Sequence, residues 1–221
     1  MKHEYITNKF CSLLDRVGVP ASQAQKKQIL EYSSMLFRWN SRINLVSRKN
    51  MPEIVYANLV SSIFYWIVVR DTIKVDVVRI ADFGSGGGFP GILLSVFMPD
   101  KKIHLVEASR KKSLFLQKVI TQLSLNAEVV NERVEDLSVR EEEKYDLVVA
   151  LAFAPLPRLI GYTQPIISKG GKLLTLKGDS WGAELNGMDI QDLRVDQITA
   201  EQSGIKNSAP LKNKLMLRLE F

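Results

Sequence analysis

An acidic residue followed by a run of glycines is the stretch whose residue types and spacing best fit a ligand site. Asp82 ends an apolar, β-branched stretch that starts at Val77. Four glycines follow within six residues: Gly84, Gly86, Gly87 and Gly88. Glycine has no Cβ atom and accepts a positive φ, so a ligand can approach the backbone closely. A helix expected to begin near Pro90 would add free N–H groups and the positive end of its dipole, which suits a nucleotide-type ligand.

A second acid, Glu107, strengthens the prediction of a bound adenosine. It ends the apolar stretch 102–106 and lies roughly 20 residues beyond the glycines, where an acid commonly accepts hydrogen bonds from ribose hydroxyls. The glycines fit two ligands. Gly84-x-Gly86-x-Gly88 after an acid is typical of S-adenosylmethionine methyltransferases, whereas Gly86-x-Gly88-x-x-Gly91 fits the dinucleotide fingerprint. These residues leave the choice between the methyl donor and NAD open.

Strand-like and helix-like patterns alternate around this stretch. Strands are expected at 77–82, 102–106, 128–131, 145–151, 172–177 and 211–221. Helices are expected at 92–97, at 110–123 and up to about 167, and residues 178–208 are less regular, with a short helix at Glu184. The order predicts an α/β fold with a mostly parallel sheet, helices on both faces and an antiparallel edge strand.

Three helices are expected before the first strand, at 4–17, 22–40 and 52–69, with Ser22 as the cap of the second. We therefore predict two domains, an N-terminal helical extension (1–74) and an α/β core (75–221). The apolar stretch 54–69 is shorter than the ~20 residues that a spanning helix needs, so it is predicted to be a buried helix without membrane contact.

The charge distribution indicates a polyanionic partner. The net charge of +6 equals the excess in residues 1–50, which hold nine Lys/Arg and three acids. The cations expected to bind the phosphates of such a partner, which the family resemblance given below implies is RNA, are Arg38, Arg42, Arg48, Lys49, Arg110, Lys111 and Lys112. A simply solvated helix surface is the alternative explanation.

The cysteine and histidine content indicates no metal. Cys11 is the single cysteine, and His3 and His104 lie far apart in sequence. The chain opens on a polar helix rather than an apolar signal sequence, so we expect a cytoplasmic protein. We also expect a monomer.

Short motifs of the chain resemble one family in their order and spacing. Trp39-Asn40 precedes Ile43-Asn44-Leu45, the glycine loop ends in Gly88-Phe89-Pro90-Gly91, and Leu105-Val106-Glu107 precedes Lys111-Lys112 and Phe115-Leu116. These pieces are similar to those of the bacterial 16S rRNA guanine-N7 methyltransferases, also called glucose-inhibited division protein B. The resemblance spans nearly the whole chain and is weakest after Gly178.

The resemblance implies a class I (Rossmann-like) methyltransferase fold, S-adenosyl-L-methionine as cofactor, and the small ribosomal subunit as partner. The implied reaction is methyl transfer to N7 of one guanine in the decoding-region loop of 16S rRNA. By motif, the implied cofactor contacts are Gly84, Phe89, Glu107, Val134 and Glu135, with Glu107 on the ribose. Asp82 is expected to accept a hydrogen bond from the cofactor's amino group, and the turn that holds Gly86 and Gly88 is expected to admit its methionyl part.

Two departures from the family pattern concern the expected pocket. Leu151 stands where the family has an arginine after the fourth core strand, and Ala57-Asn58 with Ser61-Ser62 replace its Arg-His and Asp-Ser. Lys177-Gly178 does match the family. The missing charges raise the possibility of altered cofactor affinity, target choice or activity.

The expected chemistry requires no general base, because guanine N7 is an acceptor with a free lone pair. No catalytic residue is therefore assigned, and positioning is expected to supply catalysis. Phe153 is a candidate for stacking on the guanine, with a packed side chain as the alternative. Two other functions stay open: an RNA- or ribosome-binding protein that kept the fold without the reaction, and an NAD-type oxidoreductase.

Overall fold

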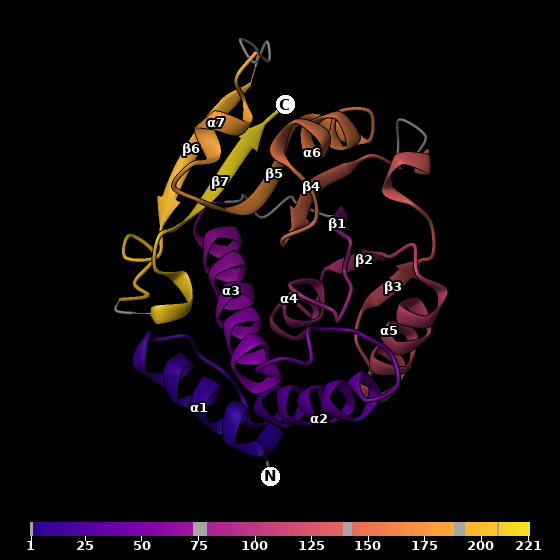
Figure 1. The fold of residues 1–221 in the computed structure, drawn as a ribbon, viewed down its shortest axis with the longest axis vertical. Helices are drawn as coiled ribbons and strands as arrows, with labels where there is room; N and C mark the ends of the chain where they lie inside the picture. Colours follow the sequence, from indigo (N-terminus) through magenta and orange to yellow (C-terminus); the bar gives the residue numbers. More distant parts are fainter. Residues whose placement is uncertain (1, 73–78, 139–142, 188–192, 207) are drawn as a thin grey trace.

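The computed structural model describes residues 2–72, 79–138, 143–187, 193–206 and 208–221 (Figure 1). The described strands are β1 (Arg79–Phe83), β2 (Lys102–Val106), β3 (Ala127–Val130), β4 (Tyr145–Ala150), β5 (Ile167–Gly178), β6 (Arg194–Thr199) and β7 (Lys214–Glu220). The described helices are α1 (Lys2–Arg16), α2 (Gln23–Asn40), α3 (Met51–Thr72), α4 (Gly91–Phe97), α5 (Arg110–Leu123), α6 (Leu156–Thr163) and α7 (Trp181–Glu184). Short 3-10 turns occur at η1 (Val134–Asp136) and η3 (Ala209–Leu211).

The strands form one sheet in the order β3-β2-β1-β4-β5-β7-β6. Neighbours from β3 to β5 pair in parallel, and β7 pairs antiparallel with both β5 and β6. The predicted mostly parallel α/β sheet is confirmed, and its antiparallel strand lies one place inside the edge.

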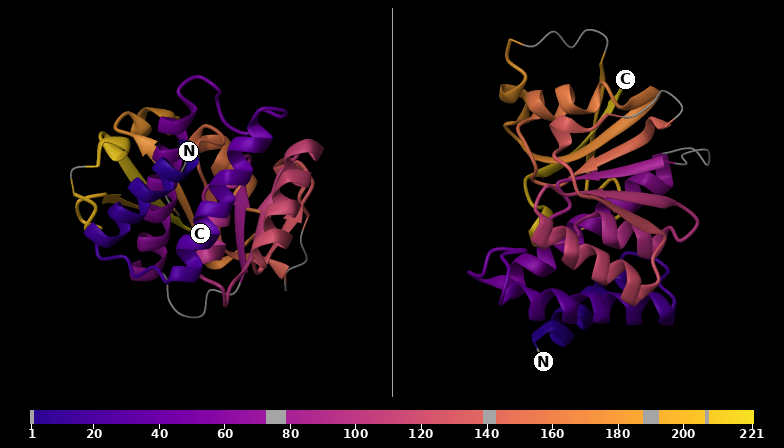
Figure 2. Two further views of the ribbon diagram at one scale, coloured as in Figure 1. Left: turned by 90° about the horizontal axis from the view of Figure 1, so that it is seen from below. Right: turned by 90° about the vertical axis from the view of Figure 1, so that its right-hand side faces the viewer.

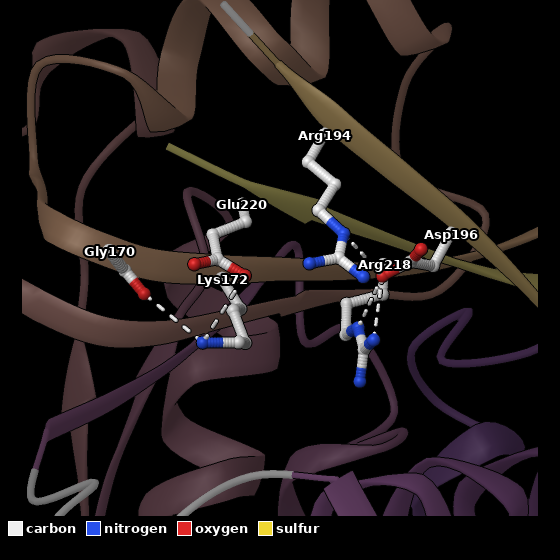
Figure 3. A network of polar contacts seen from close by, with 6 residues as sticks. All are labelled: Gly170, Lys172, Arg194, Asp196, Arg218 and Glu220. Carbon is white, nitrogen blue, oxygen red and sulfur yellow. Dashed lines mark hydrogen bonds and ion pairs between the residues drawn. The ribbon is translucent and has the colours of Figure 1, made fainter.

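The edge strand is β6, which the sequence analysis did not predict. Its sequence, RVDQIT, alternates in polarity, and no side chain in it is fully buried, so it lacks the apolar run that identified the other strands. One charged pair joins it to β7: Arg218 contacts Asp196 of β6 at 2.6 Å (Figure 3). Arg194, also on β6, contacts the same carboxylate at 3.5 Å. Lys172 of β5 and Glu220 of β7 form a further pair at 3.8 Å. Charges of this kind discourage other chains from pairing with an exposed edge.

The two faces of the sheet pack against different helices. Alternate strand residues point to opposite faces. Ile80 and Leu147 belong to a core shared with α1 to α5, whereas Ala81 and Val148 belong to a core shared with α6. Figure 2 shows the sheet between these two sets of helices, with α1 and α2 as an outer layer.

The helix α3 is the apolar core helix that the sequence predicted. Its residues Met51–Asp71 are long and apolar enough to cross a membrane by length and composition alone, but 67% of an apolar 18-residue stretch within them is buried inside the fold. Tyr65, Phe64 and Ile63 have no exposed surface. This burial is what a core helix of a soluble protein shows.

Several predicted boundaries need comment. The helix expected to reach about residue 167 ends at Thr163, and β5 begins at Ile167, because the turn after α6 comes earlier than the apolar pattern indicated. The predicted cap on α2 is confirmed: Ser22 Oγ accepts a hydrogen bond from Gln25 N at 3.2 Å. The expected start of the first strand at 77–78 and the proposed domain boundary at 74/75 lie outside the described residues, so the division into two domains stays a prediction.

Candidate cofactor and RNA site

The glycine loop leaves β1 at the carboxyl edge of the sheet, where strand ends and helix starts converge. The N–H groups of Gly84 and Ser85 donate to the carbonyl of Val106, at 2.9 and 3.1 Å, which ties the loop to the end of β2. Gly84, Gly86 and Gly88 adopt positive φ values of 68°, 54° and 99°. Residues that carry a side chain rarely adopt these backbone conformations, so the path of the loop requires glycine at these positions.

Glu107, at the end of β2, holds the glycine loop through its carboxylate. Its Oε2 accepts from Gly86 N at 2.9 Å, and its Oε1 accepts from Ser109 N at 2.8 Å. The residue is 8% exposed. A carboxylate oxygen has more than one lone pair, so each oxygen can still accept from a ribose hydroxyl. The sequence prediction paired these residues by spacing, and the structure places them in contact.

Asp82 is fully buried beneath the loop. Its Oδ2 accepts from Gly91 N at 3.0 Å, at the start of α4. Its Oδ1 is buried and has no hydrogen-bond partner among the described residues. Burial raises the pKa of Asp82 to about 7, and the negative charge of Glu107 adds to this shift, while the bond from Gly91 opposes it. Asp82 therefore has one oxygen committed to the fold and one able to accept a further hydrogen bond.

The surroundings of the loop glycines differ. A Cβ on Gly86 would meet only the carbonyl of Gly84, at 3.6 Å, so this position faces open space. A Cβ on Gly84 would lie 2.2 Å from the ring of Phe153, and one on Gly91 would lie 2.3 Å from Leu105. Gly91 is therefore needed for core packing, whereas Gly86 presents bare backbone to an approaching ligand.

The helix α2 of the N-terminal extension packs directly against this loop. Tyr32 Oη donates to the carbonyl of Gly87 at 2.6 Å, and its ring meets Phe89 edge-on at 5.5 Å. Phe89 is 5% exposed, so its side chain belongs to this core contact. Ile29, Tyr32 and Leu36 recur at the three- and four-residue spacing of a buried helix face, but this pattern gives no sign of a contact with the glycine loop.

Asn40, from the Trp39-Asn40 motif, organises the segment between α2 and α3. Its buried Oδ1 accepts from the backbone N–H groups of Leu45 and Val46, at 2.8 and 3.0 Å. Val46 lies beside Gly87, where a Cβ would be 3.4 Å from its side chain. Asn40 thus shapes a second support for the glycine loop, a role that the sequence analysis missed.

The predicted adenine-side residues lie on η1. Val134 is 6% exposed and packs with Phe83 and Val106, which are at the ends of β1 and β2. Glu135 is exposed and contacts Arg133 at 3.4 Å. The structure therefore brings Val134 to the same edge as the glycine loop, while the contact of either residue with a cofactor stays a prediction.

The segment after β4 holds the main departure from the family pattern. Leu151 is half-buried and packs against the core that includes α3. Tyr65 of α3 donates to the carbonyl of Ala150 at 2.6 Å and accepts from Leu176 N at 2.9 Å. Ser61 and Ser62 lie about one turn before Tyr65 and are buried. Tyr65 therefore links the helix that carries the substituted positions 57–58 and 61–62 to the segment that carries Leu151.

Two residues beyond Leu151 show where this segment meets the site. Ala152 has a φ of 54°, an unusual value for a residue other than glycine. Phe153 is half-buried, lies over Gly84 and meets Phe83 edge-on at 6.3 Å. Both interpretations of Phe153 thus stay open, because its ring is packed and also adjoins the loop.

Lys177 of β5 contacts the segment after β4 at Ala154. Its Nζ contacts Glu184 Oε2 at 2.9 Å and the carbonyl of Ala154 at 3.0 Å. The same carboxylate accepts from Leu156 N at 2.6 Å. Although partial burial opposes it, these donors lower the pKa of Glu184. The Lys177-Gly178 match to the family therefore corresponds to an anchor for the segment that carries Phe153.

The seven predicted RNA cations lie on the end of α2, on the segment 41–50 that follows it, and on the first turn of α5. The rings of Trp39 and Phe115 are 5.7 Å apart, so the end of α2 adjoins the first half of α5. Six of the seven side chains are exposed and Lys112 is half-buried. Arg48 also donates to the carbonyls of Asn40 and Ser41, at 3.3 and 3.2 Å, which secures the end of α2. The structure thus gathers these cations beside the glycine loop.

The residues present fit an adenosine-type cofactor that carries a cationic amino group. The observations are the free Oδ1 of Asp82, the open face of Gly86 and the buried carboxylate of Glu107. The described residues gather no group of three or more His, Cys, Asp or Glu side chains that could hold a metal ion.

The fold defines the class of protein first. The plantazolicin methyltransferase BpumL, solved with SAH, has 13% sequence identity and a TM-score of 0.53 and aligns over 99% of this chain and 98% of its own. An rRNA methylase from Streptococcus thermophilus has 15% identity and a TM-score of 0.50, over 72% of this chain and 93% of its own. These likenesses establish the class I methyltransferase fold.

The sequence comparisons then give the family. The model of the GidB family, rRNA small subunit methyltransferase G, matches residues 25–208. A protein of Acidiphilium cryptum with the name ribosomal RNA small subunit methyltransferase G is 36% identical, over 77% of this chain and 76% of its own. A protein of the same name from Paramagnetospirillum magneticum is 34% identical, over 85% of this chain and 88% of its own.

The chain belongs to the GidB family, and it is an S-adenosylmethionine-dependent rRNA methyltransferase. The family resemblance is confirmed, and the ambiguity of the glycine pattern is decided in favour of the methyl donor over NAD.

Proposed function

We propose that this protein methylates N7 of one guanine in the decoding-region loop of the small-subunit rRNA. The observation that carries the proposal is the pairing of a cofactor-type loop with a cationic surface. Glu107 fixes the loop through Gly86, and the Trp39–Phe115 contact brings the end of α2, which leads into the cationic segment 41–50, against α5. RNA phosphates would bind these cations, and a base would reach the loop edge.

The cofactor roles follow from the contacts of the glycine loop. When bound, S-adenosylmethionine supplies a methyl group activated on a sulfonium. Glu107 would accept hydrogen bonds from the ribose hydroxyls, and Oδ1 of Asp82 would accept one from the amino group. Gly86 leaves space for the close approach of the methionyl part. Val134 and Glu135 would border the adenine from η1.

Positioning is enough for the proposed reaction. Guanine N7 carries no proton, so the chain has no proton to remove before attack. An in-line approach of N7 to the methyl carbon depends on orientation, which a rigid loop and a bound RNA segment supply. Phe153 lies over Gly84 at the edge of the loop, where it would stack on the target guanine.

We also propose that the protein acts as a monomer in the cytoplasm, on the small subunit or its RNA. The test uses labelled S-adenosylmethionine with both naked 16S rRNA and small subunits from cells that lack this gene. Transfer to one guanine N7 supports the proposal and shows that Leu151 is compatible with activity. Cofactor binding without transfer to either substrate would favour an RNA-binding protein that has lost the reaction.

A further inference from the structure

A groove on the N-terminal helices lies apart from the seven cations described above. Its first part, about 650 Å³, is lined by residues of α1, the first turns of α3 and the 209–210 turn, including Tyr5 and Glu53. A second part, about 420 Å³, adds Arg16 and Lys206. Both parts share Lys9 and Tyr56, so they form one continuous groove, which we call the α1–α3 groove.

The charge of the α1–α3 groove is predominantly positive. Its cations are Lys2, Lys9, Arg16 and Lys206, all exposed, and the acid in its lining is Glu53. The side chains of Lys2, Arg16 and Lys206 make no hydrogen bond or ion pair within the described part of the chain. These cations are therefore available to an anionic ligand, and an extended row of them suits a phosphate backbone.

Two tyrosines give the groove a means of binding bases. Tyr5 of α1 is 66% exposed, which is unusual for so large a ring. Tyr56 of α3 is half-buried, and Lys9 Nζ lies 4.3 Å from the centre of its ring. A basic groove with aromatic rings is the arrangement that binds single-stranded nucleic acid, because bases stack on the rings while cations follow the phosphates.

The groove is continuous with the cationic surface beside the glycine loop. The rings of His3 and Phe37 are 6.2 Å apart, so the first turn of α1 adjoins the end of α2, next to Arg38. Pro52 and Glu53, which line the groove, follow closely after Lys49 in the chain. The groove thus adjoins, through α1 and α3, the segments that carry Arg38 and Lys49.

We propose that the α1–α3 groove binds a single-stranded segment of the substrate RNA, outside the loop that presents the target base. The proposal rests on the function proposed above, since it takes RNA as the substrate. A single strand is favoured over a duplex because unstacked bases are needed to reach Tyr5 and Tyr56, and an A-form duplex conceals its base faces.

The test compares charge reversals in the full-length protein. Lys9→Glu and Lys206→Glu place an acid in the groove, and Lys169→Glu makes the same change at an exposed position near the amino end of β5. The probe is a mixed-sequence oligoribonucleotide, used single-stranded and as a duplex over a range of KCl. Each groove variant should weaken single-strand binding roughly fivefold to tenfold and reduce the salt slope by about one.

A stacking role gives an independent measurement. Tyr5→Ala should weaken single-strand binding severalfold and leave the salt slope unchanged, because it removes a ring and no charge. Cofactor affinity, measured by calorimetry in the same variants, should stay at the wild-type value and so report an intact fold.

The proposal fails if both groove variants bind the single strand as tightly as Lys169→Glu does. It also fails if they weaken duplex and single strand equally, or if a polyglutamate peptide occupies the groove in place of RNA. The proposed methylation is judged separately, by whether the wild-type protein transfers a methyl group to rRNA.

Discussion

The hydroxyl of Tyr32 donates to the carbonyl of Gly87 at 2.6 Å, and this bond joins the N-terminal helices to the cofactor loop. Burial raises the pKa of Tyr32, so the hydroxyl remains a donor throughout the physiological range. The edge-on contact between Tyr32 and Phe89 completes the junction. The N-terminal helices thus help to set the loop conformation.

Tyr32→Phe tests this junction. The variant keeps the ring contact and leaves a buried carbonyl unpaired, so the free energy of unfolding should fall by about 1–2 kcal/mol. Cofactor affinity should fall severalfold, because the loop loses a fixed point. Chemical denaturation and calorimetry measure both quantities. Tyr5→Phe changes the same group at an exposed position, and an equal effect there would contradict the junction.

Glu107→Gln tests the link between the carboxylate and the loop. Backbone N–H groups point at both oxygens of Glu107, so a side-chain amide would set a donor against one of them. We expect cofactor affinity to fall by about tenfold or more, since a misplaced loop and a weakened ribose contact act together. Glu128→Gln, at an exposed carboxylate on β3, is the control and should bind like the wild type.

Asp82 predicts a distinct pH dependence of stability. Its pKa is about 7 when folded, against about 3.9 for an unperturbed aspartate. The folded state therefore binds this proton more tightly. The contribution of Asp82 to the free energy of unfolding is fully present below about pH 4 and is lost as the pH rises through about 7. Asp82→Asn keeps an acceptor for Gly91 and removes the titration. The difference in unfolding free energy between wild type and variant should change over this window, and a constant difference would refute the assignment.

The same group predicts pH-dependent binding. If Oδ1 accepts from the cationic amino group of the cofactor, binding favours the ionised carboxylate. Cofactor affinity of the wild type should then rise between about pH 6 and 8, while that of Asp82→Asn stays flatter. Parallel pH profiles for the two proteins would argue that Asp82 serves the fold alone.

The cross-strand pair at the edge of the sheet makes a separate stability prediction. Arg218 donates to Asp196 through two nitrogens, at 2.6 and 3.2 Å, and both side chains are half-buried (Figure 3). A double-mutant cycle with Arg218→Ala and Asp196→Ala should give a coupling energy of about 1 kcal/mol. The cycle with Arg194, which is 71% exposed, should give a value near zero.

The fold and the local motif were largely predictable from the sequence, because strand and helix periods and the glycine loop are local signals. The spacing of Glu107 from the glycines predicted one shared site, because parallel strands bring their carboxyl ends together, whereas the bond from Gly86 to Glu107 appears only in the structure. The edge strand β6 was missed, since an exposed strand carries little apolar pattern.

The long-range supports of the site could not be predicted from single stretches of sequence. Tyr32 and Gly87 are 55 residues apart, and Tyr65 and Ala150 are 85 apart. Both tyrosines appear in the sequence as ordinary buried positions of a helix. Only the folded chain shows that their hydroxyls meet backbone groups at the site.

Mapping the site of methyl transfer is the decisive measurement for the proposed reaction. Wild-type protein and Gly86→Ala are each incubated with labelled S-adenosylmethionine and small subunits from cells that lack this gene. We expect one N7-methylguanine in the decoding-region loop with the wild type. The rate of methyl transfer should fall by about tenfold or more with the variant, because its added methyl group points into the open face of the loop. Transfer to another atom or RNA, or equal activity of both proteins, would contradict this expectation.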